Sequence, residues 1–193
     1  MKFLALLVMA FALNTEATIY NSKAIVHPEV GKNGMVVSQH YLATNAGHSI
    51  LAEGGNAYDA SIAVAFALAV VLPRAGNIGG GGFMVMFDEA SQESYSIDYR
   101  EIAPEAASKN MFLASDGSVD KKRATQGVLS IGVPGTVYGM WEVHKKFGSL
   151  PWSTLLAPAI ELAEEGFLIS PFMADALNKR YKKLGKYKNF KDI

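Results

Sequence analysis

The sequence contains no cysteine among its 193 residues. Disulfide-stabilised scaffolds, thiol nucleophiles, zinc–cysteine sites and iron–sulfur clusters are therefore excluded for this chain. An excess of charge of one sign is lacking as well, since 18 basic and 18 acidic residues give a formal net charge of zero. Proteins that bind nucleic acid over a broad surface carry excess positive charge, so we expect no nucleic-acid partner. Half of the residues are hydrophobic and 19% are charged, which is typical of a globular protein.

Common catalytic signatures are also missing. The sequence has no Gly-x-Ser-x-Gly nucleophile motif, no Gly-Lys-Ser/Thr phosphate loop and no His-Glu-x-x-His zinc motif. Its four histidines are scattered, and His40 and His48 lie eight positions apart on an expected helix. That spacing separates them by about 12 Å, which is too far for one shared metal ion. We therefore predict structural or solvated histidines, no metal site and no cofactor.

The zero net charge hides a segregation of charge along the chain. Residues 179–193 carry seven basic side chains and one acidic side chain, a net charge of +6, and residues 1–178 therefore carry −6. Such a basic tail either binds an anionic membrane or nucleic acid, or is a solvated helix end that pairs with the acidic remainder of the chain. The second interpretation is favoured, because few aromatic residues are spaced regularly enough in the tail to stack on bases.

The first 17 residues have the pattern of a secretory signal peptide. Lys2 gives a short positive region, residues 3–13 form an uninterrupted apolar run, and Thr15 and Ala17 are small residues suited to a cleavage site. The apolar run is too short to span a membrane as a helix, and the alternative is a buried N-terminal helix. We predict a mature chain of residues 18–193 that is exported to the periplasm or secreted, without a stable membrane span.

The spacing of apolar residues predicts several helices and one β-hairpin. Helices are expected at residues 40–53, 57–72, 136–147, 153–165 and 171–184, and strands at 35–38, 83–88 and 94–99, with a loop and a short helix at 104–110. The stretch 60–72 is nearly all apolar, so this helix needs cover on more than one side. The pattern therefore favours a layered architecture of helices against a sheet.

Two local features are candidates for a functional site. Residues 79–82 are four consecutive glycines that follow a helix and precede a strand, the wrong order for a dinucleotide loop. Tight packing of the helix end against the sheet is the favoured interpretation of the glycines, and an anion-binding nest is the alternative. Arg100 lies just past the second strand, where a guanidinium can bind a carboxylate through two parallel hydrogen bonds. From spacing alone, an ion pair with Asp98 or Glu101 is the favoured role of Arg100.

Four motifs, taken together and in this order, resemble the γ-glutamyltranspeptidase (glutathione hydrolase) family. They are EGGNAYDA at 53–60, GNIGGGGF at 76–83, DYREIAP at 98–104 and GVPG at 132–135, within a similarity that covers most of residues 36–173. The resemblance implies an α+β fold, the four-layer αββα sandwich of N-terminal-nucleophile hydrolases, of which this chain is the N-terminal portion. Related acylases and polyglutamate-acting capsule enzymes share much of the pattern.

The resemblance also implies an activity. It is γ-glutamyl transfer or hydrolysis on glutathione and related γ-glutamyl compounds, by a precursor that cleaves itself into two subunits. The nucleophile of the family is the threonine at the N-terminus of the small subunit, whose own α-amino group serves as the base. The arginine of the family's DxRE motif binds the α-carboxylate of the γ-glutamyl group, and that residue here is Arg100.

The chain departs from the family in its length. The family's cleavage site, nucleophilic threonine and oxyanion glycines lie beyond residue 193, and neither Thr125 nor Thr136 sits in the nucleophile motif. We therefore assign no catalytic residue to this chain, and expect it to be inactive without the C-terminal part or small subunit. The alternatives are an inert truncated remnant and an interaction module that uses its basic tail. The isolated chain is expected to be unstable or aggregation-prone, because its strands and apolar helix lack partners.

Overall fold

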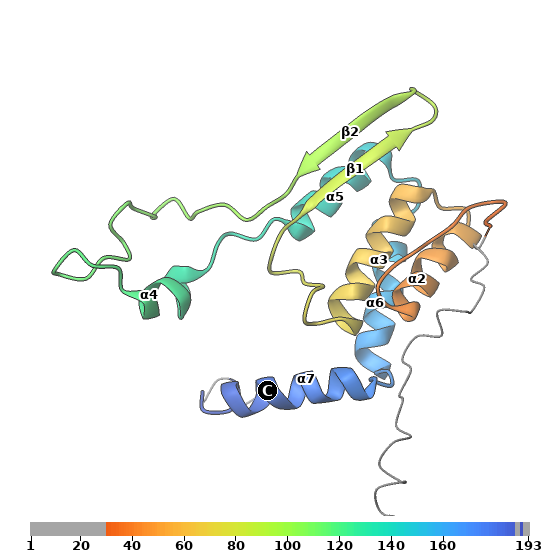
Figure 1. Ribbon diagram of the computed structural model, residues 1–193. Helices are drawn as coiled ribbons and strands as arrows, with labels where there is room; N and C mark the ends of the chain where they lie inside the picture. The colour runs from red at the N-terminus through yellow and green to blue at the C-terminus, as the bar shows by residue number, and fades with distance from the viewer. Residues whose placement is uncertain (1–29, 188–189, 191–193) are drawn as a thin grey trace, which may run out of the picture. The chain divides into compact units, whose positions relative to one another are not determined.

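A computed structural model describes residues 30–187 and residue 190. The signal peptide predicted for residues 1–17 lies outside the described residues. The chain divides into two units, residues 1–33 and 34–193, and the second unit holds all the described helices and strands. In chain order these are α2 (Tyr41–Ala52), α3 (Ala57–Val71), β1 (Phe83–Asp88), β2 (Glu93–Asp98), α4 (Lys121–Thr125), the 3-10 turn η1 (Val128–Ser130), α5 (Thr136–Phe147), α6 (Trp152–Glu165) and α7 (Pro171–Leu184) (Figure 1).

Helix α3 is the centre of the packing. It contacts α2, α5 and α6, and its buried residues include Ile62, Ala63 and Val71. Because apolar side chains surround α3, neighbours on several sides are needed to remove them from water. The prediction that residues 60–72 belong to a buried core helix is confirmed.

The N-terminus of α3 is held by hydrogen bonds around one buried carboxylate. Asn56 caps the helix, and a capping box forms because the Asp59 carboxylate accepts a hydrogen bond from the Asn56 backbone N–H at 3.1 Å. The Asp59 carboxylate is fully buried and also accepts from the N–H and the hydroxyl of Ser149, at 3.2 and 2.5 Å. Asn56 Nδ2 donates to the carbonyl of Phe147 at 2.7 Å. The EGGNAYDA motif, which contains Asn56 and Asp59, therefore joins α3 to the turn between α5 and α6.

The two strands form an antiparallel hairpin in which Phe83 pairs with Asp98 and Asp88 pairs with Glu93. Its inner face carries Met86, which packs into the same apolar cluster as Met140 and other residues of α5. The side chains of Phe83, Val85 and Phe87 on the other face are exposed. This alternation is the period of two expected for a strand with one buried face.

Two predictions about local structure are wrong. Residues 35–38 form no strand; the Ser38 hydroxyl instead bonds to the Thr44 hydroxyl at 2.8 Å, in the segment that leads into α2. Residues 104–110 contain turns but no helix, and the short helix is α4, whose Asp120 cap accepts from the N–H of Arg123 at 3.0 Å. A helix of five residues is too short to show apolar periodicity. The other predicted helices and both hairpin strands are confirmed to within one residue at each end.

The ends of the last two helices follow local rules. Pro158 lies inside α6, and Gly166 follows its last residue with a φ of 78° that favours glycine. The hydroxyl of Ser170 accepts from the N–H of Met173 at 3.2 Å, and Pro171 occupies the first turn of α7. None of the described helices combines the length and the apolar content that a membrane crossing requires.

Candidate functional site

Three of the four motifs meet around the end of β2. The segment 99–102 pairs with the glycine loop on one side, where Tyr99 N–H donates to Gly82 at 3.0 Å. On the other side Ile102 and Val133 exchange two backbone hydrogen bonds of 3.2 and 2.9 Å. The two flanking loops are joined directly, since the carbonyl of Gly80 accepts from the N–H groups of Gly135 and Thr136 at 2.8 and 3.0 Å. We call these three backbone segments, residues 80–82, 99–102 and 132–136, the glycine clasp.

Glycine is required in the clasp because backbone lies against backbone. A Cβ on Gly81 would stand 2.7 Å from the Cα of Arg100 and 2.8 Å from the nitrogen of Glu101. A Cβ on Gly135 would collide with the carbonyl of Tyr99. The packing interpretation of the glycine run is thus confirmed at Gly81 and Gly82, which lie against residues 99–101, whereas a Cβ on Gly80 would meet only the nearby Asn77 side chain and one on Gly79 would meet nothing within 4 Å.

We expect Gly135→Ala to be destabilising and Gly79→Ala to be nearly neutral. The added methyl at Gly135 meets main-chain atoms that cannot rotate away, whereas Gly79 has open space and no positive φ. Overpacking of this kind costs about 1–3 kcal/mol of stability. Urea unfolding of both variants measures the difference. Equal unfolding free energies for the two would contradict the clasp as described.

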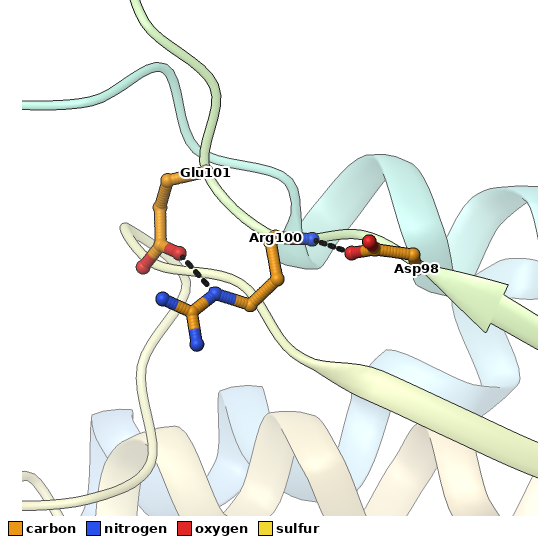
Figure 2. Close-up of polar contacts among 3 residues, drawn as sticks. All are labelled: Asp98, Arg100 and Glu101. Carbon is orange, nitrogen blue, oxygen red and sulfur yellow. Dashed lines mark hydrogen bonds and ion pairs between the residues drawn. The ribbon is translucent and has the colours of Figure 1, made fainter.

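Arg100 projects from the clasp with its side chain 60% exposed (Figure 2). Its backbone N–H donates to Asp98 Oδ1 at 2.9 Å, and its Nε donates to Glu101 Oε2 at 3.1 Å. Its guanidinium carbon lies 5.8 Å from the centre of the Phe83 ring, within the range of a cation–π contact. The ion pair predicted from spacing is confirmed, with Glu101 as the partner of the side chain.

The ion pair does not consume the hydrogen-bonding capacity of Arg100. A guanidinium has five N–H donors, and the contact with Glu101 uses only the one on Nε. Among the described residues, neither terminal nitrogen of Arg100 has a hydrogen-bond partner. The two terminal nitrogens can therefore bind a carboxylate side by side while Glu101 holds the base of the guanidinium.

Tyr99 fixes the strand end next to Arg100. Its ring lies against Gly139 of α5, where a Cβ would collide with it, and its hydroxyl donates to the carbonyl of Phe83 at 3.4 Å. Burial raises the pKa of the Tyr99 phenol above its ordinary value, so the hydroxyl stays protonated to a higher pH than that of an exposed tyrosine. Sequence reasoning missed the roles of Tyr99 and Phe83, because no side-chain pattern marks which residue faces a distant glycine.

The histidines and threonines considered from the sequence do not gather at Arg100. His40 caps α2, where its Nδ1 accepts from the N–H of Leu42 at 3.3 Å, and His48 is exposed. Nε2 of His144 lies 2.8 Å from the carbonyl of Leu150. The fourth histidine, at position 27, is outside the described residues. Within residues 30–187, no group of three or more potential metal-binding side chains occurs.

The two threonines have ordinary helical positions. The Thr125 hydroxyl donates to the carbonyl of Lys121 at 2.7 Å in α4, and Thr136 is the first residue of α5. That this chain supplies no catalytic residue stays a prediction.

Comparisons with known proteins agree with the motifs. A family model described as Gamma-glutamyltranspeptidase matches residues 43–193. The chain is 50% identical to the glutathione hydrolase proenzyme of Pseudomonas aeruginosa over 71% of its own length, and 44% identical to that of Escherichia coli over 79%. It covers 24% and 26% of those two relatives, so it spans about a quarter of their length.

A solved structure gives the same assignment. The crystal structure of Helicobacter pylori γ-glutamyltranspeptidase matches with a TM-score of 0.79 and 47% identity, over 84% of this chain and 46% of that one. The described residues are thus a partial α+β fold of the N-terminal-nucleophile hydrolase class, as the resemblance implied. The chain belongs to the γ-glutamyltranspeptidase family.

Proposed function

We propose that this chain is the N-terminal part of a self-cleaving precursor that transfers or hydrolyses γ-glutamyl groups of glutathione and related compounds. Its similarity to proteins named glutathione hydrolase proenzyme supports this proposal. The observation that carries it is Arg100, an exposed guanidinium on a rigid backbone, with two terminal nitrogens that have no hydrogen-bond partner among the described residues. This geometry suits one small carboxylate, and a γ-glutamyl group carries such an α-carboxylate.

In this proposal the chain binds and orients the substrate. Arg100 holds the α-carboxylate through two parallel hydrogen bonds, which places the γ-amide at a fixed distance from the clasp. A threonine at the N-terminus of the second subunit attacks the amide carbon, and its hydroxyl proton passes through the α-amino group to the departing amine. Water or an acceptor amine then attacks the acyl-enzyme ester and restores the threonine hydroxyl.

The proposal includes a compartment and a partner. The signal-peptide pattern of residues 1–17 supports export to the periplasm or the medium. The partner is the remainder of the precursor, which supplies the nucleophile and the oxyanion donors. Glutathione and related γ-glutamyl compounds are the substrates.

Incubation of the whole protein with glutathione tests the proposed function. The expected result is release of glutamate, together with cleavage of the precursor into two chains, the second of which begins with threonine. N-terminal sequencing and a glutamate assay measure the two events separately. An uncleaved protein that releases no glutamate would instead favour the inert remnant.

A further inference from the structure

Helix α7 has two unlike faces. Met173 is buried, and with Leu177, Arg180 and Leu184 it lines a groove that Pro73 and Arg74 line from the other side. These positions recur every three or four residues and therefore share one face of the helix. On this side of α7 only Met173 is buried, and Leu177 is 42% exposed.

The opposite face of α7 is a row of lysines. Lys179, Lys182, Lys183 and, just past the helix end, Lys186 follow the spacing i, i+3, i+4, i+7, and all four are exposed. The row is about 10 Å long. Of the described acidic residues, only Asp175 pairs with any of these lysines, 2.6 Å from Lys179 within the same helix. We call these four residues the lysine row.

The lysine row bears on the two interpretations of the basic tail. Pairing with the acidic remainder of the chain would place carboxylates against the lysines. Among the described residues no carboxylate outside α7 lies within ion-pair distance of the row. The positive charge of the row therefore faces solvent.

We propose that the lysine row docks the protein on an anionic lipid surface. A cationic row on one helix face can bring several ammonium groups to a flat layer of lipid phosphates at once. Residues 1–178 carry a net charge of −6, so an anionic surface repels the rest of the chain and attracts this end. Phe172, which is 69% exposed, lies seven positions before Lys179 and so on the same side of α7 as the row, where it suits the boundary between lipid headgroups and acyl chains.

A lipid surface fits the row better than nucleic acid does. The aromatic residues around the lysines are not spaced to stack on successive bases. A protein that carries a signal peptide would also meet anionic lipid at the membrane that it crosses. The proposal does not depend on the γ-glutamyl activity, because α7 and the glycine clasp share no residue.

Binding to vesicles by the whole protein tests the proposal. Phosphatidylcholine vesicles with and without phosphatidylglycerol are sedimented with the protein at low and at high salt. The expected result is binding that needs phosphatidylglycerol and weakens as salt rises. The triple variant Lys182→Gln, Lys183→Gln, Lys186→Gln should bind at least about tenfold more weakly. The variant Lys182→Arg, Lys183→Arg, Lys186→Arg keeps the three positive charges and should bind the vesicles as the unmodified protein does.

Helix α4 offers the matched control. Lys121, Lys122 and Arg123 are three consecutive exposed cations, and changing all three to Gln removes the same charge at another place. This control should bind vesicles as the unmodified protein does. Equal losses for the two triple variants would overturn the proposal, as would equal binding to vesicles without phosphatidylglycerol. Tighter binding to single-stranded DNA than to the vesicles at matched salt would also overturn it, in favour of nucleic acid.

Discussion

The variant Arg100→Gln is expected to lower kcat/KM of the whole protein for a γ-glutamyl substrate by about a hundredfold or more. Two charge-assisted hydrogen bonds to the α-carboxylate are lost, and an uncharged amide cannot replace them. The carboxylate is held equally in the ground state and the transition state, so most of the loss should appear in KM. Steady-state kinetics with glutathione measure both constants.

Two comparisons separate carboxylate binding from general damage. Arg100→Lys keeps the charge but loses the planar pair of donors, and should cost less than Arg100→Gln. A substrate analogue without the α-carboxylate should be equally poor for the unmodified protein and for Arg100→Gln. The control Arg123→Gln, in α4, should leave the kinetics unchanged. An unchanged KM in both Arg100 variants would refute the assignment.

The variant Asp59→Ala is expected to destabilise the turn between α5 and α6 by about 1–3 kcal/mol. It removes the fully buried carboxylate that accepts from the Asn56 N–H and from the N–H and hydroxyl of Ser149. The half-buried Asn56 N–H loses its partner, while Ser149 is exposed and its donors can bond to water, so the cost is mainly that of the lost capping box and of hydrogen bonds to a charged group. Hydrogen exchange measured on peptides from α3 and the turn should rise by about tenfold or more.

A second aspartate provides the comparison for Asp59. Asp116 accepts from the N–H and the hydroxyl of Ser118 at 2.9 and 2.6 Å, in the same manner as Asp59, but on an exposed turn. These bonds lower the pKa of the Asp116 carboxyl, whose donors water can satisfy once the carboxylate is gone. Asp116→Ala should therefore change hydrogen exchange only at its own turn. A comparable effect of both substitutions would show that burial of Asp59 is not the cause.

Local signals predicted the helices and the hairpin well. Asn56 marks the start of α3, Ser170 and Pro171 mark the start of α7, and alternating apolar residues mark the strands. These signals act through neighbours in the chain, so they can be read from a short window of sequence. The same local signals wrongly predicted a strand at residues 35–38, because apolar residues form a sheet only where another strand pairs with them.

The sequence led to Arg100 as a candidate, whose role stays a prediction, but it did not predict the contacts that hold Arg100 in place. The DxRE motif identified Arg100, whereas nothing local indicated that Gly80 accepts from the start of α5 or that Asp59 binds Ser149, 90 residues away. Both contacts join groups that are far apart in the chain, and neither leaves a periodic pattern in the sequence. The glycines of GVPG were the available signal, since a required glycine indicates close backbone approach.

The glycine clasp fixes the backbone position of residue 100 largely independently of the side chain that this residue carries. Its backbone position is set by hydrogen bonds of its neighbours and by glycines at positions 81 and 135, whereas its own side chain adds only exposed contacts with Glu101 and Phe83. A substitution at this position therefore carries little folding penalty, while it changes the chemistry presented to a ligand. The group that this position presents to a ligand can therefore change without loss of the surrounding backbone structure.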